Sequence, residues 1–350
     1  MSSRAFGRQP ENSQRKSGAR RAGFTLVEML VAVTILIIIL GLVFTMVQQA
    51  SAAWRGSTGK MGSFRDARTV FEAVTRTISQ TTLNTYYDYQ YDASGKPTAY
   101  VRKSDLQFIC GKNLLASVSS IPQPVGHSIF FQAPLGYSGT SSYTGCTGLL
   151  NACGFYLQYG PDTTSPSFLS SILPSRNRYR LMQFLQPSEN LAVYDPATAA
   201  NSGSNSWFLG PLAQSSPPVS QLAENVVALV ILPQVSGSSS TALAPYYEYD
   251  TRNSASTNSY NQLPPILQVT MVIMDESAAI KLGNAQSNLT TGASFTQASQ
   301  LNSDLQILEA NLSALPGNKA SNTIPARYQI FQSSVPILDA KWNSIDLPTP

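Results

Sequence analysis

Residues 20–28 read Arg20-Arg21-Ala22-Gly23-Phe24-Thr25-Leu26-Val27-Glu28, and a run of 19 uncharged residues follows from Met29 to Val47. As a helix this run would span about 28 Å, close to the roughly 30 Å hydrocarbon core of a bilayer. Glu28 therefore lies at the N-terminal end of a segment that can cross a membrane. Because a charge at the bilayer centre costs about 2.5–3.5 kcal/mol, we expect this carboxylate to have a partner. A cut between Gly23 and Phe24 would create an α-ammonium four residues away from it.

The first 23 residues are strongly basic. They hold 6 of the 23 Lys and Arg residues and 1 of the 19 Asp and Glu residues, which leaves 17 basic and 18 acidic residues in the rest of the chain. By the positive-inside rule, the N-terminus stays in the cytoplasm and the body of the chain is exported. Without this leader the net charge falls from +4 to −1. Net charge then gives no support for nucleic-acid binding, and we predict a membrane partner and no nucleic-acid partner.

The segment from Arg20 to Glu28 resembles the class III signal of type IV pilins and type II secretion pseudopilins, in which a basic leader and a Gly precede Phe-Thr-Leu-Val-Glu and an apolar helix. The resemblance implies that a prepilin peptidase cuts between Gly23 and Phe24 and methylates Phe24. It also implies that Glu28 neutralises the ammonium of a neighbouring subunit when pilins or pseudopilins assemble at an inner-membrane platform.

Two other interpretations of the N-terminus remain open. Arg20-Arg21 and Ala50-Ser51-Ala52 could belong to a cleaved twin-arginine signal, although the apolar region of such a signal is usually about 7–15 residues long and carries no acid at its start. The chain could also have an ordinary single-pass anchor in which Glu28 has no special role.

We divide the chain into a leader (1–23), the membrane half of a long helix (24–47), an amphipathic half (48–84) and an exported β-rich domain (85–350). The chain has no proline between Phe24 and Tyr91, so the helix can continue past the membrane and end near Leu83-Asn84. Its second half has apolar residues at helical spacing: Met61, Phe64, Phe71, Val74 and Ile78. A weak point or kink is expected where glycines interrupt it, at Gly56, Gly59 and Gly62.

Beyond residue 84, apolar and alternating runs predict strands at 106–110, 128–132, 154–159, 179–185, 224–232 and 266–274. Leucines at a 4-3-4-3 spacing from Leu301 to Leu315 predict an amphipathic helix, and 328–331 and 336–342 are expected to close the sheet. We expect a packed loop at 86–92 and long polar loops at 195–220 and 235–262. The predicted fold class is α+β and pilin-like: a long N-terminal helix packed on an antiparallel β-sheet with long polar loops.

The later part of the chain adds two resemblances. The run Leu222–Leu229, followed by Leu263-Pro264-Pro265, is similar to large minor pilins and J-type minor pseudopilins. The segments Leu83–Tyr89 and Ala340-Lys341-Trp342 resemble the C-type Verru_Chthon cassette protein, a pilin-like family of Verrucomicrobia. Together they imply a structural minor pseudopilin of a type II secretion-like system, with a periplasmic domain. There are two alternatives: a minor pilin for adhesion, motility or DNA uptake, and a single-pass binding protein that does not polymerise.

The sequence shows no motif for catalysis or for a cofactor, and we predict neither an enzyme nor a metal site. His127 is the sole histidine, so a histidine-rich metal site is excluded. Oxygen ligands for calcium could come from Asp88, Asp92, Glu248 and Asp250, but their spacing matches no EF-hand, and solvated loops are the favoured interpretation. Export permits a disulfide between Cys146 and Cys153; buried free thiols are the alternative.

Overall fold

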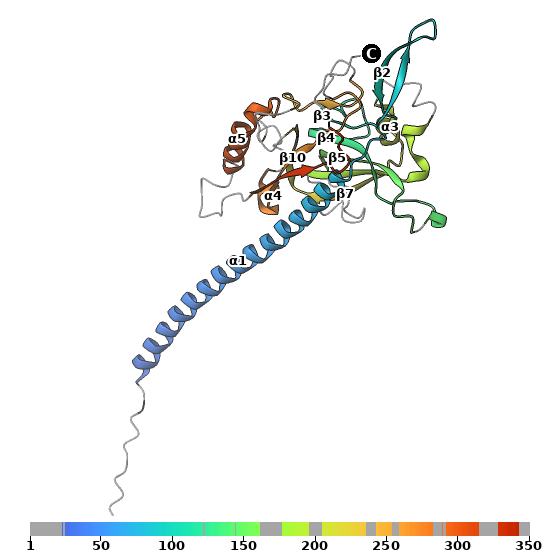
Figure 1. The fold of residues 1–350 in the computed structure, drawn as a ribbon. Helices are drawn as coiled ribbons and strands as arrows, with labels where there is room; N and C mark the ends of the chain where they lie inside the picture. The colour runs from blue at the N-terminus through green and yellow to red at the C-terminus, as the bar shows by residue number, and fades with distance from the viewer. Residues whose placement is uncertain are drawn as a thin grey trace, which may run out of the picture. The chain divides into compact units, whose positions relative to one another are not determined.

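The structure is a computed structural model that describes residues 23, 25–121, 123–143, 145–161, 177–195, 205–235, 243–253, 259–282, 289, 292–314 and 328–342. The chain forms two compact units, Met1–Gly59 and Lys60–Pro350. One helix, α1 (Leu26–Ser79), runs from the first unit into the second. The fold class is α+β, as the sequence predicts (Figure 1).

Helix α1 continues far past the apolar run, as predicted, and its helical backbone is unbroken through the three glycines. It ends at Ser79, earlier than the predicted Leu83-Asn84. The reason is a competing partner, because the Thr82 N–H donates to the Gln132 carbonyl at 3.0 Å and so joins the chain to a strand. In the second unit the helix buries one stripe, formed by Ala67, Phe71, Val74 and Ile78. Three of these four residues belong to the predicted stripe.

The larger sheet has six antiparallel strands in the order β7-β6-β5-β4-β3-β9. Their bounds are β3 Ile109–Lys112, β4 Pro124–Pro134, β5 Leu150–Pro161, β6 Asn177–Gln186, β7 Val219–Glu224 and β9 Tyr249–Asp250. The two long central strands, β4 and β5, are buried on both faces along most of their length, and each buries polar as well as apolar side chains. One face carries an aromatic cluster in which Phe130 stacks on Phe208 of helix α3 (Ser206–Leu212), with ring centroids 4.0 Å apart.

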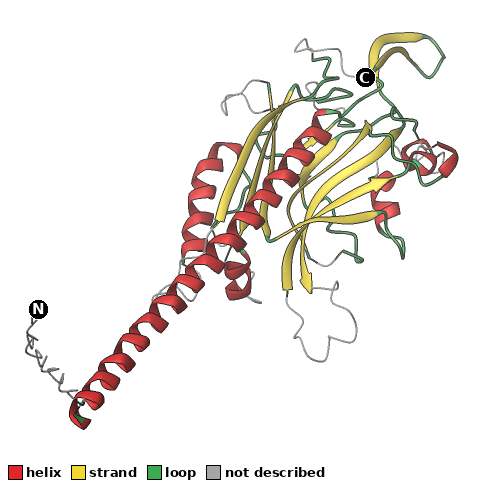
Figure 2. Cartoon of the chain, turned by 90° about the horizontal axis from the view of Figure 1, so that it is seen from below, coloured by secondary structure: helices red, strands yellow, loops and turns green. Residues whose placement is uncertain are grey.

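The smaller sheet has three antiparallel strands in the order β11-β10-β8. Strand β10 (Ile266–Met274) coincides with its prediction, and β8 (Val226–Gln234) differs from its prediction at both ends. A single strand, β11 (Tyr328–Pro336), takes the place of the two predicted segments 328–331 and 336–342, and the prediction for 337–342 is wrong because these residues form no strand. Alternate residues of β10 enter two separate cores. One core includes the end of α1, where Phe71 stacks on Phe331, and the other includes α4 (Glu276–Leu282) and α5 (Leu301–Ser313) (Figure 2). This sheet is therefore covered by helices on both faces.

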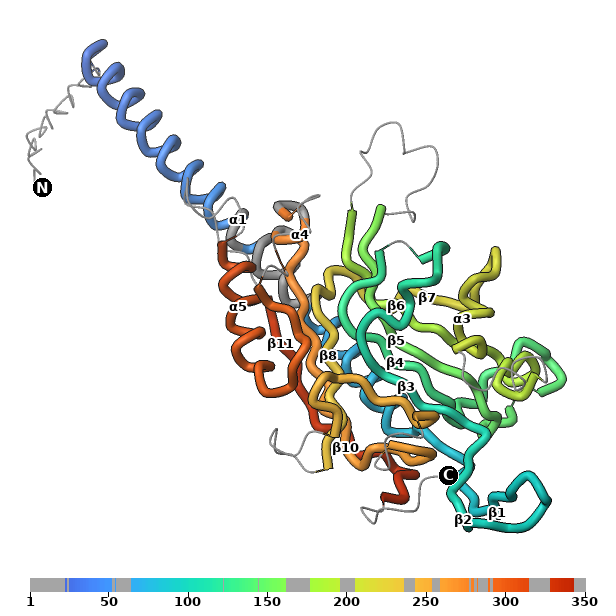
Figure 3. Tube along the Cα trace, turned by 90° about the horizontal axis from the view of Figure 1, so that it is seen from above, coloured from blue at the N-terminus to red at the C-terminus, as the bar shows by residue number. Residues whose placement is uncertain are grey.

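A third, two-stranded sheet corrects the expectation of a packed loop at 86–92. Strands β1 (Tyr86–Tyr91) and β2 (Pro97–Lys103) form a hairpin that extends away from the two larger sheets (Figure 3). The ranges expected to be polar loops also contain secondary structure, because 195–220 includes α3 and the start of β7, and 235–262 includes β9. The sequence predicts a single sheet, whereas the described residues form three.

Candidate functional site

Thr25 and Glu28 form a capping box at the first turn of α1. The Thr25 N–H and the Thr25 hydroxyl both donate to Glu28 Oε2, at 2.9 and 3.0 Å, and the Glu28 N–H donates to Thr25 Oγ1 at 3.3 Å. This reciprocal arrangement satisfies backbone donors that a helix N-terminus otherwise leaves free. Both bonds to the carboxylate use Oε2, so no described residue donates to Oε1. The sequence analysis identified Glu28 but missed this role of Thr25, although Thr-x-x-Glu before an apolar run is its signature.

The helix that follows the capping box has an apolar surface on all sides. Its large apolar side chains from Leu26 to Val47 are 49–80% exposed. Soluble monomers rarely expose contiguous apolar patches larger than a few hundred Å². The segment Leu26–Ser51 is long and apolar enough to cross a membrane, and it lies near the N-terminus. This surface fits a single-pass membrane anchor that can also pack against other helices.

Three small or polar residues interrupt the apolar run. The hydroxyls of Thr34 and Thr45 donate to the carbonyls of Val31 and Leu42, each at 2.8 Å. These bonds satisfy both hydroxyls within the helix, which makes them tolerable in lipid. A Cβ added at Gly41 would meet no atom within 4 Å, so this position leaves room for the close approach of another helix.

The predicted cleavage site lies at the edge of the described residues. Gly23 is exposed, and a Cβ added there would meet no atom within 4 Å. Phe24, the predicted site of methylation, and residues 1–22 lie outside the described residues.

The cysteines are free thiols in the structure, so the Cys146–Cys153 disulfide is not formed there. Cys153 lies in β5, where burial raises the pKa of its thiol to about 12, whereas Cys146 is exposed in a loop. Burial likewise raises the pKa of the Cys110 thiol. The sequence left open a Cys146–Cys153 disulfide and buried free thiols. In the structure both thiols are free, and only Cys153 is buried.

Three of the four acids considered as calcium ligands have other partners in the structure. Asp88 pairs with Lys103 at 2.8 Å, Asp92 accepts the N–H groups of Ser94 and Lys96 in its own turn, and Asp250 pairs with Arg252 at 2.6 Å. No group of three or more metal-ligating side chains occurs among the described residues.

His127 lies between the two larger sheets. Its Nδ1 accepts the Ile231 N–H from β8 at 3.3 Å, and its Nε2 lies 3.0 Å from the Phe295 carbonyl, to which it donates. Burial lowers the pKa of the imidazole to about 4. Both ring nitrogens are engaged, so this histidine is a neutral structural link.

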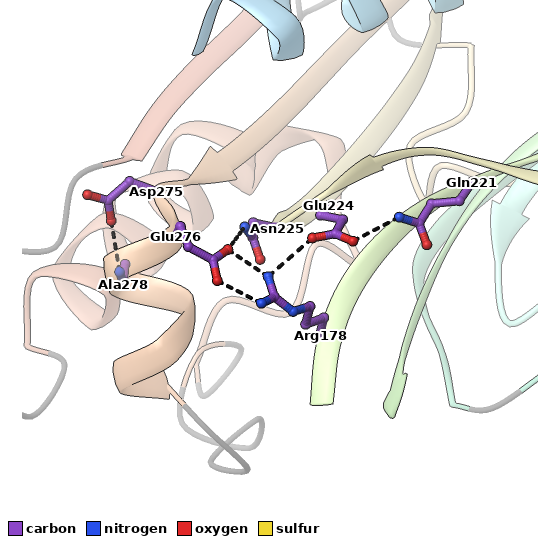
Figure 4. Close-up of polar contacts among 7 residues, drawn as sticks. All are labelled: Arg178, Gln221, Glu224, Asn225, Asp275, Glu276 and Ala278. Atoms are coloured by element: carbon purple, nitrogen blue, oxygen red, sulfur yellow. Dashed lines mark hydrogen bonds and ion pairs between the residues drawn. The ribbon is translucent and has the colours of Figure 1, made fainter. Parts of the chain in front are cut away.

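An ionic cluster lies where the chain passes from the larger sheet to the smaller one (Figure 4). Arg178 of β6 makes a bidentate contact with Glu276 of α4, at 2.6 and 2.7 Å, and its Nη1 also contacts Glu224 at 3.2 Å. Asn225, which joins β7 to β8 with φ +62°, donates to Glu276 Oε2 at 3.0 Å. The sequence analysis missed this cluster because its members are far apart in the chain. Its contacts are internal, and we assign it to holding the sheets together.

The structure also contains a cleft of about 940 Å³ at the end of β6. Its lining includes Tyr137, Tyr194 and the carboxylates Glu189 and Asp195, and none of the described lining residues is Lys, Arg or His. Hydrogen bonds from its own backbone N–H and from the Ser138 hydroxyl lower the pKa of Glu189 to about 2. That carboxylate is therefore ionised at neutral pH and has no proton to donate.

The comparisons with known proteins concern the N-terminus. Residues 18–44 match the family model of the prokaryotic N-terminal methylation motif, a range that holds Gly23, Phe24, Thr25 and Glu28. No curated protein and no solved structure is matched by the chain. The family match and the capped, exposed apolar helix agree with each other. The chain therefore carries the prokaryotic N-terminal methylation motif, which supports a class III signal of the type IV pilin kind and implies processing by prepilin peptidase.

Proposed function

We propose that the protein is a structural minor pseudopilin that assembles into a short periplasmic pseudopilus of a type II secretion-like system. Its partners are the prepilin peptidase, other pseudopilins and an inner-membrane assembly platform. The size of the second unit, Lys60–Pro350, supports a minor position, at the tip or in priming. The basic leader supports a cytoplasmic N-terminus and a periplasmic domain.

The observation that carries this proposal is the Glu28 carboxylate at the start of an exposed apolar helix. Its two bonds from Thr25 complete the capping box. When a growing filament draws the helix outward, Glu28 crosses the bilayer centre, where a charge costs about 2.5–3.5 kcal/mol. Hydrogen bonds from Thr25 leave the charge of the carboxylate in place. The ammonium of Phe24 in a neighbouring subunit would neutralise that charge, and no described residue donates to the Oε1 atom.

We also propose that the protein is not an enzyme. The chain's sole histidine is buried, neutral and bonded at both nitrogens. The thiols of Cys110 and Cys153 are held protonated by burial, which makes them poor nucleophiles. The lowered pKa of the Glu189 carboxylate in the cleft makes it a weak base. These groups support a structural role because the histidine is engaged at both nitrogens, the two buried thiols are protonated and the carboxylate is a poor proton acceptor.

Substitution of Glu28 tests the proposal. Glu28→Gln keeps a side chain that can complete the capping box but removes the charge, whereas Glu28→Ala removes both. We expect both variants to be cleaved normally and both to be lost from filaments. Glu72→Ala is the matched control, because Glu72 is an exposed acid farther along the same helix, paired with Arg68. Crosslinking between subunits measures incorporation into filaments, and the electrophoretic mobility of the chain shows whether the leader has been removed. Normal filament incorporation of Glu28→Gln would refute the charge-pairing role.

Two alternatives have their own tests. A minor pilin for adhesion, motility or DNA uptake would be encoded beside a retraction ATPase, whereas a pseudopilin would be encoded beside a secretin and further pseudopilins. A single-pass binding protein that does not polymerise would give no crosslinks between its membrane helix and sister subunits. Helix-to-helix crosslinks near residue 24 would exclude it.

A further inference from the structure

The β1–β2 hairpin has four exposed tyrosines on one side, which we call the tyrosine face: Tyr87, Tyr89, Tyr91 and Tyr100. Side chains two apart in a strand share a face, and Tyr100 lies directly opposite Tyr89 in the strand register. The four side chains are 43–57% exposed. Their rings contact one another, with centroids 5.2 Å apart for Tyr89 and Tyr100 and 5.4 Å apart for Tyr87 and Tyr100.

The tyrosine face is held in place before any ligand binds. An isolated two-stranded hairpin is at best marginally stable in water, but stacked and edge-to-face aromatic pairs add to its stability. The turn is fixed by Asp92, whose carboxylate accepts the N–H groups of Ser94 and Lys96, both at 2.9 Å. On the other side of the hairpin, Asp88 pairs with Lys103 at 2.8 Å. A preorganised surface loses little entropy when it binds a ligand.

The hydroxyl groups of this face are available. No hydrogen bond among the described residues engages the hydroxyls of Tyr89, Tyr91 or Tyr100. A phenol can both donate and accept. The face therefore offers flat π surfaces bordered by free hydroxyl groups.

Charge argues against a polyanion as the ligand. Lys103 is paired with Asp88, and Arg102 is buried, where it donates to the Tyr260 carbonyl and to the Gln262 side chain. Lys96 is exposed, but it is a single lysine in the turn beside Asp92. Single-stranded nucleic acid needs a positively charged groove that follows its phosphates as well as rings that stack on its bases. The hairpin has the aromatic rings but lacks the positively charged groove, so its surface suits a neutral ligand.

The area of the face argues against a protein as the ligand. At their observed exposure, four tyrosines offer roughly 300–500 Å², taking about 150–250 Å² for each whole ring side chain. A standard protein interface needs about 800 Å² from each partner. The face is large enough for a few sugar rings and too small for a stable protein interface.

We propose that the tyrosine face binds a neutral polysaccharide. The C–H faces of successive pyranose rings lie against the tyrosine rings, whose π faces are electron-rich, and sugar hydroxyls bond to the phenol hydroxyls. This role is independent of the filament function, because it needs only the folded hairpin.

Titration of the full chain in detergent with cellohexaose, chitohexaose and maltoheptaose tests the proposal. We expect the wild type to bind at least one of these with a Kd of about 1 mM or tighter. Tyr89→Ala and Tyr100→Ala should each weaken that binding about tenfold, through loss of a stacked ring. Tyr86→Ala is the matched control, because Tyr86 lies on the opposite face of β1 and is also exposed, at 43%; it should bind like the wild type.

A second variant distinguishes loss of binding groups from unfolding of the hairpin. Tyr89→Phe with Tyr100→Phe keeps both rings and removes two hydroxyls, so it should fold and bind about three- to tenfold more weakly. Hydrogen exchange of the hairpin amides reports whether each variant is folded. Failure of all three glycans to bind, unchanged binding by both the Ala and the Phe variants, or tighter binding of the oligonucleotide dT20 than of any glycan would overturn the proposal.

Discussion

The buried histidine gives a prediction whose magnitude follows from the structure. His127 of β4 accepts the Ile231 N–H of β8 and donates to the Phe295 carbonyl, and the Tyr247 ring centroid lies 4.6 Å from the imidazole centroid. Burial is the main reason why its pKa is lowered to about 4, and the nearby positive charge of Lys112 lowers it further. A proton on Nδ1 would remove the acceptor for Ile231.

The free energy of unfolding should therefore depend on pH in a defined window. Between the unfolded pKa of about 6.5 and the folded pKa of about 4, the unfolded chain binds a proton at His127 and the folded chain does not. Stability from this group is complete above pH 6.5 and is lost as the pH falls to about 4. One pKa unit corresponds to about 1.4 kcal/mol, so the loss is roughly 3 kcal/mol.

Urea unfolding of the detergent-solubilised chain at pH 7, 5.5 and 4 measures this effect against His127→Gln. Glutamine keeps a donor and an acceptor and does not titrate, so the variant should lose roughly 3 kcal/mol less between pH 7 and pH 4 than the wild type. Because the chain has one histidine, its imidazole proton resonance in NMR belongs to His127 alone. The same pH dependence in both proteins, or an imidazole that titrates near 6.5, would refute the reasoning.

Two further predictions concern packing and thiol exposure. Gly154→Ala should destabilise the protein by about 1–3 kcal/mol in the same unfolding assay, because the new Cβ would lie 2.8 Å from the Ile129 carbonyl oxygen and closer still to the Phe130 ring. Gly210→Ala is the control: its Cβ would meet no atom within 4 Å inside α3, so this variant should be neutral or stabilising. Equal effects of the two substitutions on the free energy of unfolding would contradict this packing. A maleimide should modify the exposed Cys146 rapidly in the native protein and the buried cysteines only after unfolding, as measured by mass spectrometry; one modified thiol that appears only after reduction would indicate a disulfide instead.

Elements with strong periodicity could be predicted from the sequence. In strand β10, which follows Pro264-Pro265, apolar residues alternate with other residues, and in α5 leucines recur at helical spacing. In both elements the sequence pattern agrees with the observed burial. The hairpin strand β1 was misread because its alternating residues are tyrosines, which also suit a packed loop. The separation into three sheets could not be predicted, since it depends on pairings between residues far apart in the chain.

The candidate site was predicted in part. The charge pattern around Glu28 and the apolar run indicated the signal, and the family match supports it. The missed residue, Thr25, forms its bonds within one helical turn, so its role was readable from the Thr-x-x-Glu spacing. The Arg178 cluster was not readable, because it joins β6, the β7–β8 junction and α4.

Mass spectrometry of the N-terminal peptide, from protein purified from its native host, tests the central claim most directly. If prepilin peptidase removes the leader so that a new ammonium can meet Glu28, the first residue is Phe24 and it carries one methyl group on its nitrogen. A chain that starts at Met1, or near Ala53, would contradict the account.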